Sequence, residues 1–280
     1  MSVRIAWYGK HFGEEPPLVG DDQQGSGTIF FSKCNLKCVF CQNWQISQEN
    51  LGKDYSEDEL VEIMLDLQKQ NAVNINLVTP TIWWMTIVPA IKKAKEKGLK
   101  IPIVWNSNGY EHVQVLKRVA DVVDIFLPDF KYGINSLGQK YSGIPNYTDI
   151  ATEAIKYMNQ IRPKLILDKN GIAKSGLIVR HLILPTQTEN SLRAIDILSS
   201  INKNIFVSLM AQYSPFYRSN EYPELRITNP APREGRGNNE EEVQKVFNHL
   251  TEKGMLNGWT QEIDSSDCFV PDFTKKNPFK

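Results

Sequence analysis

The sequence predicts an α/β fold in which parallel strands form an open, partial (β/α)6 barrel of the TIM-like kind. Apolar strand-like runs alternate along the chain with helix-like stretches, and this order favours βα units over an antiparallel sandwich. Six such units can be counted, which is too few for an eight-stranded barrel. Right-handed crossovers would still curl them into part of one. The 280 residues, 41% of them hydrophobic, suit one sizeable domain.

The predicted strands are short apolar runs, each leading into a loop, a turn signal or a helix pattern, as βα units require. A hairpin over residues 165–171, marked by Asn170-Gly171, is predicted ahead of the fifth strand. The six strands are predicted over residues 28–32, 74–79, 101–105, 122–127, 176–184 and 206–210.

The predicted helices begin and end at recognisable signals. Ser56 and Glu59 form a capping-box pattern ahead of the apolar positions of the first helix, and Gly98 is a typical residue to end the second. A long polar loop is predicted over residues 132–146. The helices after the first are predicted over residues 86–97, 112–120, 148–160, 191–200 and 239–253.

These elements divide the chain into three parts. Residues 28–215 form the predicted barrel core, residues 1–27 an N-terminal extension, and residues 216–280 a loop, helix and tail packed on the barrel. The segment 8–17 of the extension is too rich in special residues to be an inert tail, although its sequence assigns it no role.

Composition argues against several classes of partner. Basic and acidic residues each number 32, so the formal net charge of zero gives no electrostatic reason to expect nucleic acid or an anionic membrane. Residues 1–8 lack the apolar core of a signal peptide, and the densest apolar stretch, 82–91, is too short to span a bilayer. Four cysteines in this length are no disulfide framework. We therefore expect a cytoplasmic, reduced protein.

A cysteine triplet bears most directly on function. Cys34, Cys38 and Cys41 follow the first predicted strand with three and two residues between them. A [4Fe-4S] cluster held entirely by protein needs four thiolates, so three neighbouring ligands leave one iron open to a substrate or cosubstrate. Cys268 lies far along the chain and is a poor candidate for the fourth ligand. An open iron is oxidised by air, which implies an anaerobic or low-oxygen setting.

Two other interpretations of the triplet remain. A structural zinc site is one, although such sites normally show a second pair of cysteines or histidines at short spacing. A chance grouping of reduced, buried thiols is the other.

The stretch Cys34-Asn35-Leu36-Lys37-Cys38-Val39-Phe40-Cys41 resembles the CxxxCxφC signature of radical S-adenosylmethionine enzymes, with Phe40 as the aromatic residue. The similarity covers about residues 28–215, and the nearest branch is that of the pyruvate formate-lyase activating enzymes. The resemblance implies a partial (β/α)6 barrel and one [4Fe-4S] cluster, whose open iron is chelated by the amino and carboxylate groups of S-adenosylmethionine. Reductive cleavage then gives methionine and a 5'-deoxyadenosyl radical, chemistry that the cofactors supply and the protein orients.

Residues at the C-terminal ends of strands are candidates for binding S-adenosylmethionine, because active sites of such barrels lie there. Where the family carries a Gly-Gly-Glu-like segment for the methionine amino group, this chain has Thr79-Pro80-Thr81. The Thr81 hydroxyl and the carbonyls near Thr79 are candidate acceptors, and a proline-capped strand end is the alternative. Asn106-Ser107 resembles the activases' Asp-Thr. Because Asn106 stands where the activases have aspartate, any cation site there has one negative charge fewer.

Further polar residues follow the next strands. Asp129-Phe130-Lys131 resembles the activases' Asp-Leu-Lys, which implies a lysine beside the methionine carboxylate and an aspartate holding a cation or a salt bridge. A polar exit from the barrel is the alternative. Arg180 and His181 alternate on the fifth strand, and Arg180 is expected to face inward. Gln212 at the end of the sixth strand is a candidate contact for adenosine or substrate.

The sequence thus predicts a radical S-adenosylmethionine enzyme with a single cluster that abstracts hydrogen, with a glycyl radical enzyme as one candidate substrate. Such an enzyme needs a reductant such as flavodoxin or ferredoxin. Three alternatives stay open: a radical enzyme for a non-protein substrate, an electron-transfer iron–sulfur protein and a zinc-stabilised binding module. Charged residues at the strand ends argue against simple electron transfer.

Overall fold

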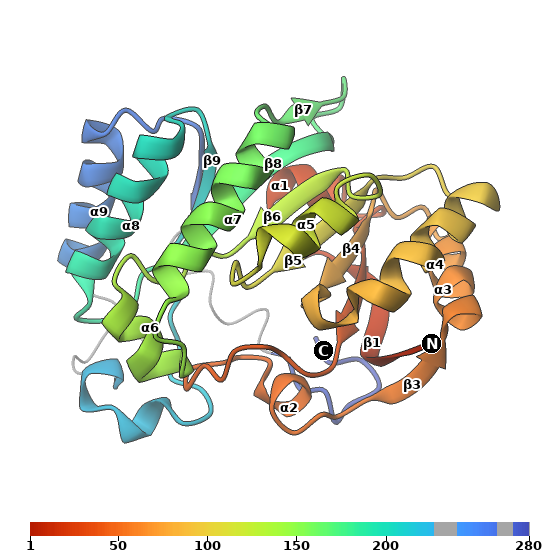
Figure 1. Ribbon diagram of the computed structural model, residues 1–280, viewed down its shortest axis with the longest axis horizontal. Coiled ribbons are helices and arrows are strands. Elements are labelled where there is room, and N and C mark those ends of the chain that lie inside the picture. The colour runs from red at the N-terminus through yellow and green to blue at the C-terminus, as the bar shows by residue number, and fades with distance from the viewer. Residues whose placement is uncertain (227–239, 262–270, 280) are drawn as a thin grey trace.

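The computed structural model describes residues 1–226, 240–261 and 271–279, and one sheet runs through them (Figure 1). Its strand order is β10-β9-β8-β6-β5-β4-β2-β1-β3, with the short β7 paired to β8. The strands are β1 (Ser2–His11), β2 (Ser26–Phe31), β3 (Lys53–Ser56), β4 (Ile75–Val78), β5 (Ile103–Ser107), β6 (Ile125–Pro128), β7 (Ile166–Leu167), β8 (Ala173–Leu182), β9 (Phe206–Met210) and β10 (Gly258–Gln261).

The parallel part of this sheet confirms the predicted α/β fold with a partial TIM-like barrel. The six predicted strands are present as β2, β4, β5, β6, β8 and β9, and each pairs in parallel with the next. β8 begins at Ala173, three residues before the predicted start. β10 adds a further parallel strand beside β9 that was not predicted, because its sequence Gly-Trp-Thr-Gln is not an apolar run of the kind that marked the other strands.

Helices follow the parallel strands and cover the outer face of the sheet, with α3 beside α4 near one edge and α8 beside α9 near the other (Figure 1). No helix in the described ranges is both long and apolar enough to cross a membrane. The helices are α1 (Pro16–Val19), α2 (Trp44–Ser47), α3 (Glu57–Lys69), α4 (Trp84–Glu96), α5 (Val113–Val119), α6 (Asn135–Ser142), α7 (Tyr147–Ile161), α8 (Thr188–Ile201) and α9 (Glu240–Glu252), with single 3-10 turns at Thr81–Trp83, Ser219–Glu221 and Pro223–Leu225.

The predicted loop over 132–146 is wrong, because it contains the helix α6 (Asn135–Ser142). This helix has few apolar residues to give a periodic pattern, and it is held by tertiary contacts. Tyr141 and Ser142 are buried, and the hydroxyls of Ser142 and Tyr132 lie 2.7 Å apart. Gly143 ends the helix in the left-handed conformation, at φ 73°, as glycine commonly does.

The N-terminal segment contributes a strand to the same sheet. β1 pairs antiparallel with β2, where Gly9 faces Thr28, and with β3, where Val3 faces Tyr55. Residues 2–11, part of the predicted extension 1–27, therefore lie along the edge of the barrel's first strand. After His11, which pairs with Ser26 at the start of β2, the chain turns into the short helix α1.

The interior of the barrel has an apolar layer and a polar layer. The inward-facing residues include Val104 of β5, Ile125 of β6 and Ile178 of β8. They pack with Leu18 of α1 in one buried cluster. Two residues further along two of these strands, Asn106 and Arg180 occupy the same face. α1 thus fills one end of the barrel interior. Polar side chains line the interior nearer the C-terminal ends of the strands.

Candidate active site

The three clustered cysteines line a cavity of about 580 Å³ together with residues from the strand ends. They lie in the loop between β2 and α2, and Cys38 is buried while Cys34 and Cys41 are partly exposed. Helix α6 supports this loop, since Lys37 N donates to the Ser142 carbonyl (3.2 Å) and Val39 N to the Tyr141 carbonyl (2.9 Å). The helix that sequence reasoning missed is therefore part of the site.

Each cysteine sulfur has a polar side chain beside it. The Asn108 amide donates to Cys34 Sγ at 3.2 Å, and the Ser142 hydroxyl donates to Cys38 Sγ at 2.9 Å. The hydroxyl of Ser47 lies 3.3 Å from Cys41 Sγ. Each of these three side chains can donate a hydrogen bond to its sulfur when the sulfur is negatively charged, which suits thiolates bound to metal.

Burial raises the pKa of all three thiols, that of Cys38 to about 12. The cysteines also raise one another's pKa, because a second negative charge nearby is unfavourable. Three such thiols become thiolates when a cationic centre compensates their charge. The described residues contain no His, Cys, Asp and Glu group placed to hold a single metal ion. Three sulfurs around one cavity fit an iron–sulfur cluster, in which each thiolate binds a different iron.

A chain of charged groups leads from the cysteines into the barrel. Lys131 Nζ lies 2.6 Å from Asp129 Oδ2, and Arg180 Nε donates to Asp129 Oδ1 at 2.8 Å. A second nitrogen of Arg180 donates to the side-chain oxygen of Asn106 at 2.5 Å. Burial tends to raise the pKa of Asp129, but Arg180 and Lys131 outweigh it and the pKa is lowered. Asp129 is therefore ionised, with a cationic side chain on each carboxylate oxygen.

Most of the residues predicted to bind cofactor lie around the cavity. Phe40 packs near Tyr132 and Tyr213, and Arg180 faces inward as predicted. His181 points to the opposite face of β8, where its ring nitrogens contact the Phe130 carbonyl (2.6 Å) and the Ser191 hydroxyl (2.9 Å). The predicted residues that line the cavity are Phe40, Thr79, Asn106, Ser107, Asp129, Lys131, Arg180 and Gln212.

Thr81 is the exception, because its hydroxyl does not reach this cavity. It donates to the carboxylate of Glu111 at 2.9 Å, within the 3-10 turn after β4. Glu111 also accepts from Trp105 Nε1 (2.7 Å) and from the Ser107 hydroxyl (2.6 Å). Sequence reasoning missed Glu111, which ties the ends of β4 and β5 together. Thr79 does line the cavity, in a left-handed backbone conformation (φ 59°) that is uncommon for a threonine.

Two further residues of the cavity, Glu14 and Glu15, come from the N-terminal segment. The only signal for them in the sequence was the unusual composition of residues 8–17. Arg180 lies 3.5 Å from Glu14 Oε2 and connects this pair to the chain of charges described above. Cys268 lies outside the described residues, so its place relative to the site stays untested.

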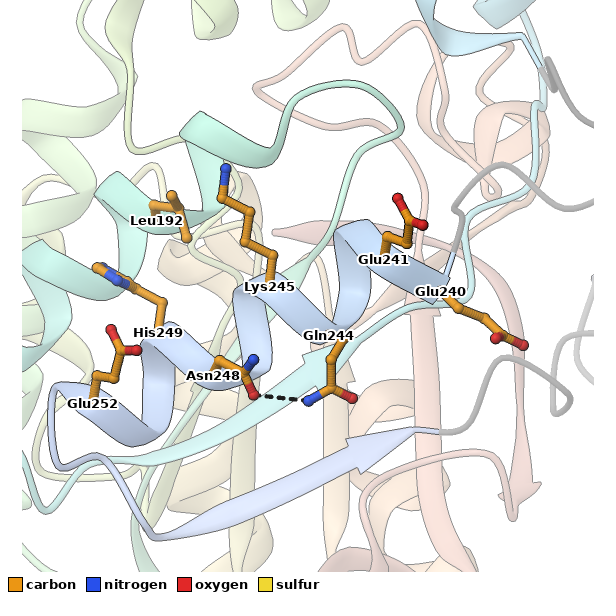
Figure 2. Close-up of a pocket in the computed structure, with 8 residues that line it drawn as sticks. All are labelled: Leu192, Glu240, Glu241, Gln244, Lys245, Asn248, His249 and Glu252. Atoms are coloured by element: carbon orange, nitrogen blue, oxygen red, sulfur yellow. Dashed lines mark hydrogen bonds between the residues drawn. The ribbon is translucent and has the colours of Figure 1, made fainter.

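A second hollow, of about 690 Å³, lies on the surface of α9 beside α8, on the outer face of the fold (Figure 2). Two of its polar contacts are ordinary surface interactions. The Gln244 amide donates to the Asn248 side chain at 2.8 Å, and His249 lies 2.9 Å from Asp196. Exposed charged groups of this kind favour an ordinary solvated helix face, so the cysteine-lined cavity is the stronger candidate.

Comparison with known proteins identifies the family of the chain and proteins of similar fold. Residues 28–198 match the model of the Radical SAM superfamily. The uncharacterised protein MJ0674 of Methanocaldococcus jannaschii is 36% identical over 225 residues, which are 77% of this chain and 60% of that protein. The crystal structure of Streptococcus suis SuiB has a similar fold, with a TM-score of 0.56 and 15% identity over 82% of this chain and 47% of SuiB. SuiB has also been solved with S-adenosylmethionine and with its precursor peptide SuiA.

Proposed function

Because the chain belongs to the radical S-adenosylmethionine superfamily, we propose that it binds one [4Fe-4S] cluster through Cys34, Cys38 and Cys41 and abstracts hydrogen from a substrate in the adjoining cavity. One observation carries the proposal: the three cysteines share a single cavity with charged side chains from the ends of several parallel strands. When bound there, the cluster supplies the electron that cleaves S-adenosylmethionine reductively to methionine and a 5'-deoxyadenosyl radical.

The residues of the chain bind and orient the cosubstrate in this proposal. Lys131 offers a compact positive charge to the methionine carboxylate, while Asp129 and Asn106 hold Lys131 and Arg180 in position. The backbone carbonyl of Thr79 is the proposed acceptor for the methionine amino group, since the Thr81 hydroxyl is engaged by Glu111. The adenosyl group of S-adenosylmethionine is proposed to lie against three other residues that line the cavity, Phe40, Ser107 and Gln212.

The proposed partners follow from the chemistry. A low-potential donor such as flavodoxin or ferredoxin supplies the electron, and a cytoplasm with little oxygen protects the cluster. The substrate is a small molecule or a peptide, and the glycine of a glycyl radical enzyme is one candidate. SuiB, which has a similar fold, was crystallised with a precursor peptide, so a peptide substrate is compatible with a barrel of this kind.

The decisive test is the formation of 5'-deoxyadenosine. We would purify the chain without oxygen, reconstitute it with iron and sulfide, add S-adenosylmethionine and dithionite, and quantify the nucleoside by chromatography with mass detection. We expect it to accumulate with the unaltered chain and to be lost in Cys38→Ala. The variant Cys268→Ala is the matched control and should keep both cluster and cleavage.

Metal analysis separates the alternatives before any turnover is measured. About four irons with acid-labile sulfide per chain agree with the proposal, whereas one zinc contradicts it. A verified, reduced cluster that yields no 5'-deoxyadenosine would favour the electron-transfer protein. Complete loss of the cluster in Cys268→Ala would contradict the proposal that Cys34, Cys38 and Cys41 are its only protein ligands.

A further inference from the structure

The floor of the cysteine-lined cavity is formed by the N-terminal segment. After β1, the chain passes through Glu14 and Glu15 into α1, whose Leu18 packs inside the barrel. The Leu18 carbonyl accepts a hydrogen bond from the Asn74 side chain at 2.8 Å, and Leu18 N donates to the Glu15 carbonyl at 2.8 Å. These contacts fix the segment under the polar layer of the barrel. Both glutamates line the cavity from this position.

The two glutamates are buried but poorly compensated. The Glu14 side chain is 6% exposed, and its contact with Arg180 is the long one, at 3.5 Å, because that guanidinium already bonds to Asp129 and Asn106. Glu15 is 3% exposed, and its Oε2 atom has no hydrogen-bond partner in the described part of the chain. In this part of the cavity the cationic groups are fewer than the carboxylates. Arg180 and Lys131 face three carboxylates, those of Glu14, Glu15 and Asp129.

Unpartnered polar atoms gather at the same place. The hydroxyl of Ser208 on β9 is buried and lines the cavity close enough to Glu15 to lower its pKa, yet it makes no hydrogen bond of ordinary geometry within the described ranges. The amide of Asn76, behind the cavity wall, is also buried without a hydrogen bond of ordinary geometry in the described ranges, and it lies close enough to Glu14 to lower the pKa of that residue. Buried polar atoms are nearly always hydrogen-bonded, so a group of unpartnered ones calls for a ligand.

The charge and the hydrogen-bonding capacity of this group define the ligand. One negative charge is in excess when all three carboxylates are ionised, and burial raises the pKa of both glutamates, so each tends to hold a proton unless a cation replaces it. Glu15 Oε2 and the Ser208 hydroxyl are both acceptors. A primary ammonium carries one positive charge and three donors. Phe30, Leu182 and Met210 line the cavity as well and suit an alkyl chain.

We propose that the floor formed by Glu14, Glu15 and Ser208 is a substrate subsite for a protonated primary amine, which Glu15 and Ser208 bind directly. The inference rests on the proposed function in taking this cavity as the substrate site. The proposed function places the methionine ammonium of S-adenosylmethionine at the carbonyl of Thr79, which follows β4, whereas the floor is formed by the N-terminal segment and by Ser208 of β9. The amine is therefore a group of the substrate, either a free amine or a lysine side chain.

Saturation-transfer NMR on the full chain with its reconstituted cluster tests this proposal, with and without S-adenosylmethionine. The probes are n-butylammonium, 1-butanol and butyrate, which share an alkyl chain and differ in charge. We expect n-butylammonium to bind at least about tenfold more tightly than the other two, because a charged hydrogen bond in a buried site is worth about 1.5–3 kcal/mol. N-acetyl-lysine N-methylamide, added as a competitor, displaces n-butylammonium if the natural amine is a lysine side chain and does not if it is a free amine.

Matched variants locate the site. Glu15→Gln keeps the shape and removes the charge, and should weaken n-butylammonium binding by about tenfold. Glu153→Gln makes the same change on the exposed face of α7 and should leave binding unaltered. If Glu15→Gln fails to fold, Ser208→Ala, which removes one proposed acceptor, should weaken binding by about threefold.

Equal binding of the ammonium and the alcohol would overturn the proposal and assign the unpartnered atoms to buried water. So would displacement of n-butylammonium by potassium chloride but not by tetramethylammonium chloride, which would assign the carboxylates to an inorganic cation. Probe binding does not require cleavage of S-adenosylmethionine. A chain that binds the amine but forms no 5'-deoxyadenosine therefore contradicts the proposed function and not this subsite.

Discussion

At the scale of single residues, the three cysteines of the loop depend on the polar side chains that surround their sulfur atoms. Asn108, Ser142 and Ser47 come from three different segments, and each approaches a different sulfur. Hydrogen bonds to cysteine sulfur stabilise the more negative, reduced state of a cluster and so raise its reduction potential. These side chains are therefore expected to govern how easily the proposed cluster is reduced.

Replacement of Ser142 by alanine tests this expectation. It removes the hydrogen bond to Cys38 Sγ, and the reduction potential should fall by about 40 mV, because a hydrogen bond is worth about 1 kcal/mol and about 59 mV corresponds to 1.4 kcal/mol for one electron. A redox titration followed by electron paramagnetic resonance measures the change. Ser199→Ala on α8, whose hydroxyl bonds to the Asp196 carbonyl, is the control. An unchanged or higher potential in Ser142→Ala contradicts the assigned role.

At the scale of elements, some helices are specified by local sequence signals and others by tertiary contacts. The capping box of α3 is present as predicted: Ser56 Oγ accepts from Glu59 N at 3.3 Å, and Glu59 Oε2 accepts from Ser56 N at 2.7 Å. In contrast, α6 has no side-chain cap and is held by its contacts with the cysteine loop. A helix of the first kind can be predicted from sequence, and one of the second kind cannot.

The cap of α3 should have a measurable effect on stability. Ser56→Ala removes the acceptor for the Glu59 amide and should lower the free energy of unfolding by about 1 kcal/mol. Denaturant titration of the anaerobic protein measures this loss. Ser200→Ala, at an exposed position of α8, should change it by less than about 0.5 kcal/mol. Equal effects of the two substitutions would show that the capping box contributes nothing.

At the scale of the whole molecule, β8 connects the inside of the barrel to its outer helices. Arg180 reaches Asp129, Asn106 and Glu14 inside, so that one guanidinium joins β8, β5, the end of β6 and the N-terminal segment. His181, on the other face, lies between the Phe130 carbonyl and Ser191 of α8. Burial lowers the pKa of His181 from 6.5 to about 4, so the folded protein keeps this ring neutral.

Global stability should therefore depend on pH through His181. Between pH 6.5 and pH 4 the unfolded chain protonates this histidine and the folded chain does not, so stability is lost as pH falls through that window. From pH 7 to pH 5, the unaltered protein should lose about 2 kcal/mol more than His181→Gln. Denaturant titrations of both proteins at the two pH values measure the difference. Parallel losses would contradict a buried, neutral His181.

The sequence by itself determined the parallel α/β architecture, the cysteine triplet and most of the strand-end residues around it. Apolar alternation and caps depend on neighbours along the chain, and the spacing of Cys34, Cys38 and Cys41 is itself a local pattern. The inward direction of Arg180 followed from the two-residue repeat of a strand and is confirmed.

Only the tertiary structure decided what closes the cavity and what supports the cysteines. Glu14 and Glu15 precede all the parallel strands in the sequence, and they reach the cavity because β1 pairs antiparallel with β2 and brings α1 into the barrel. Thr81 looked like a cofactor contact from its place in the chain, but Glu111, 30 residues away, engages its hydroxyl. Such contacts depend on how distant segments pack, and no local pattern in the sequence encodes them.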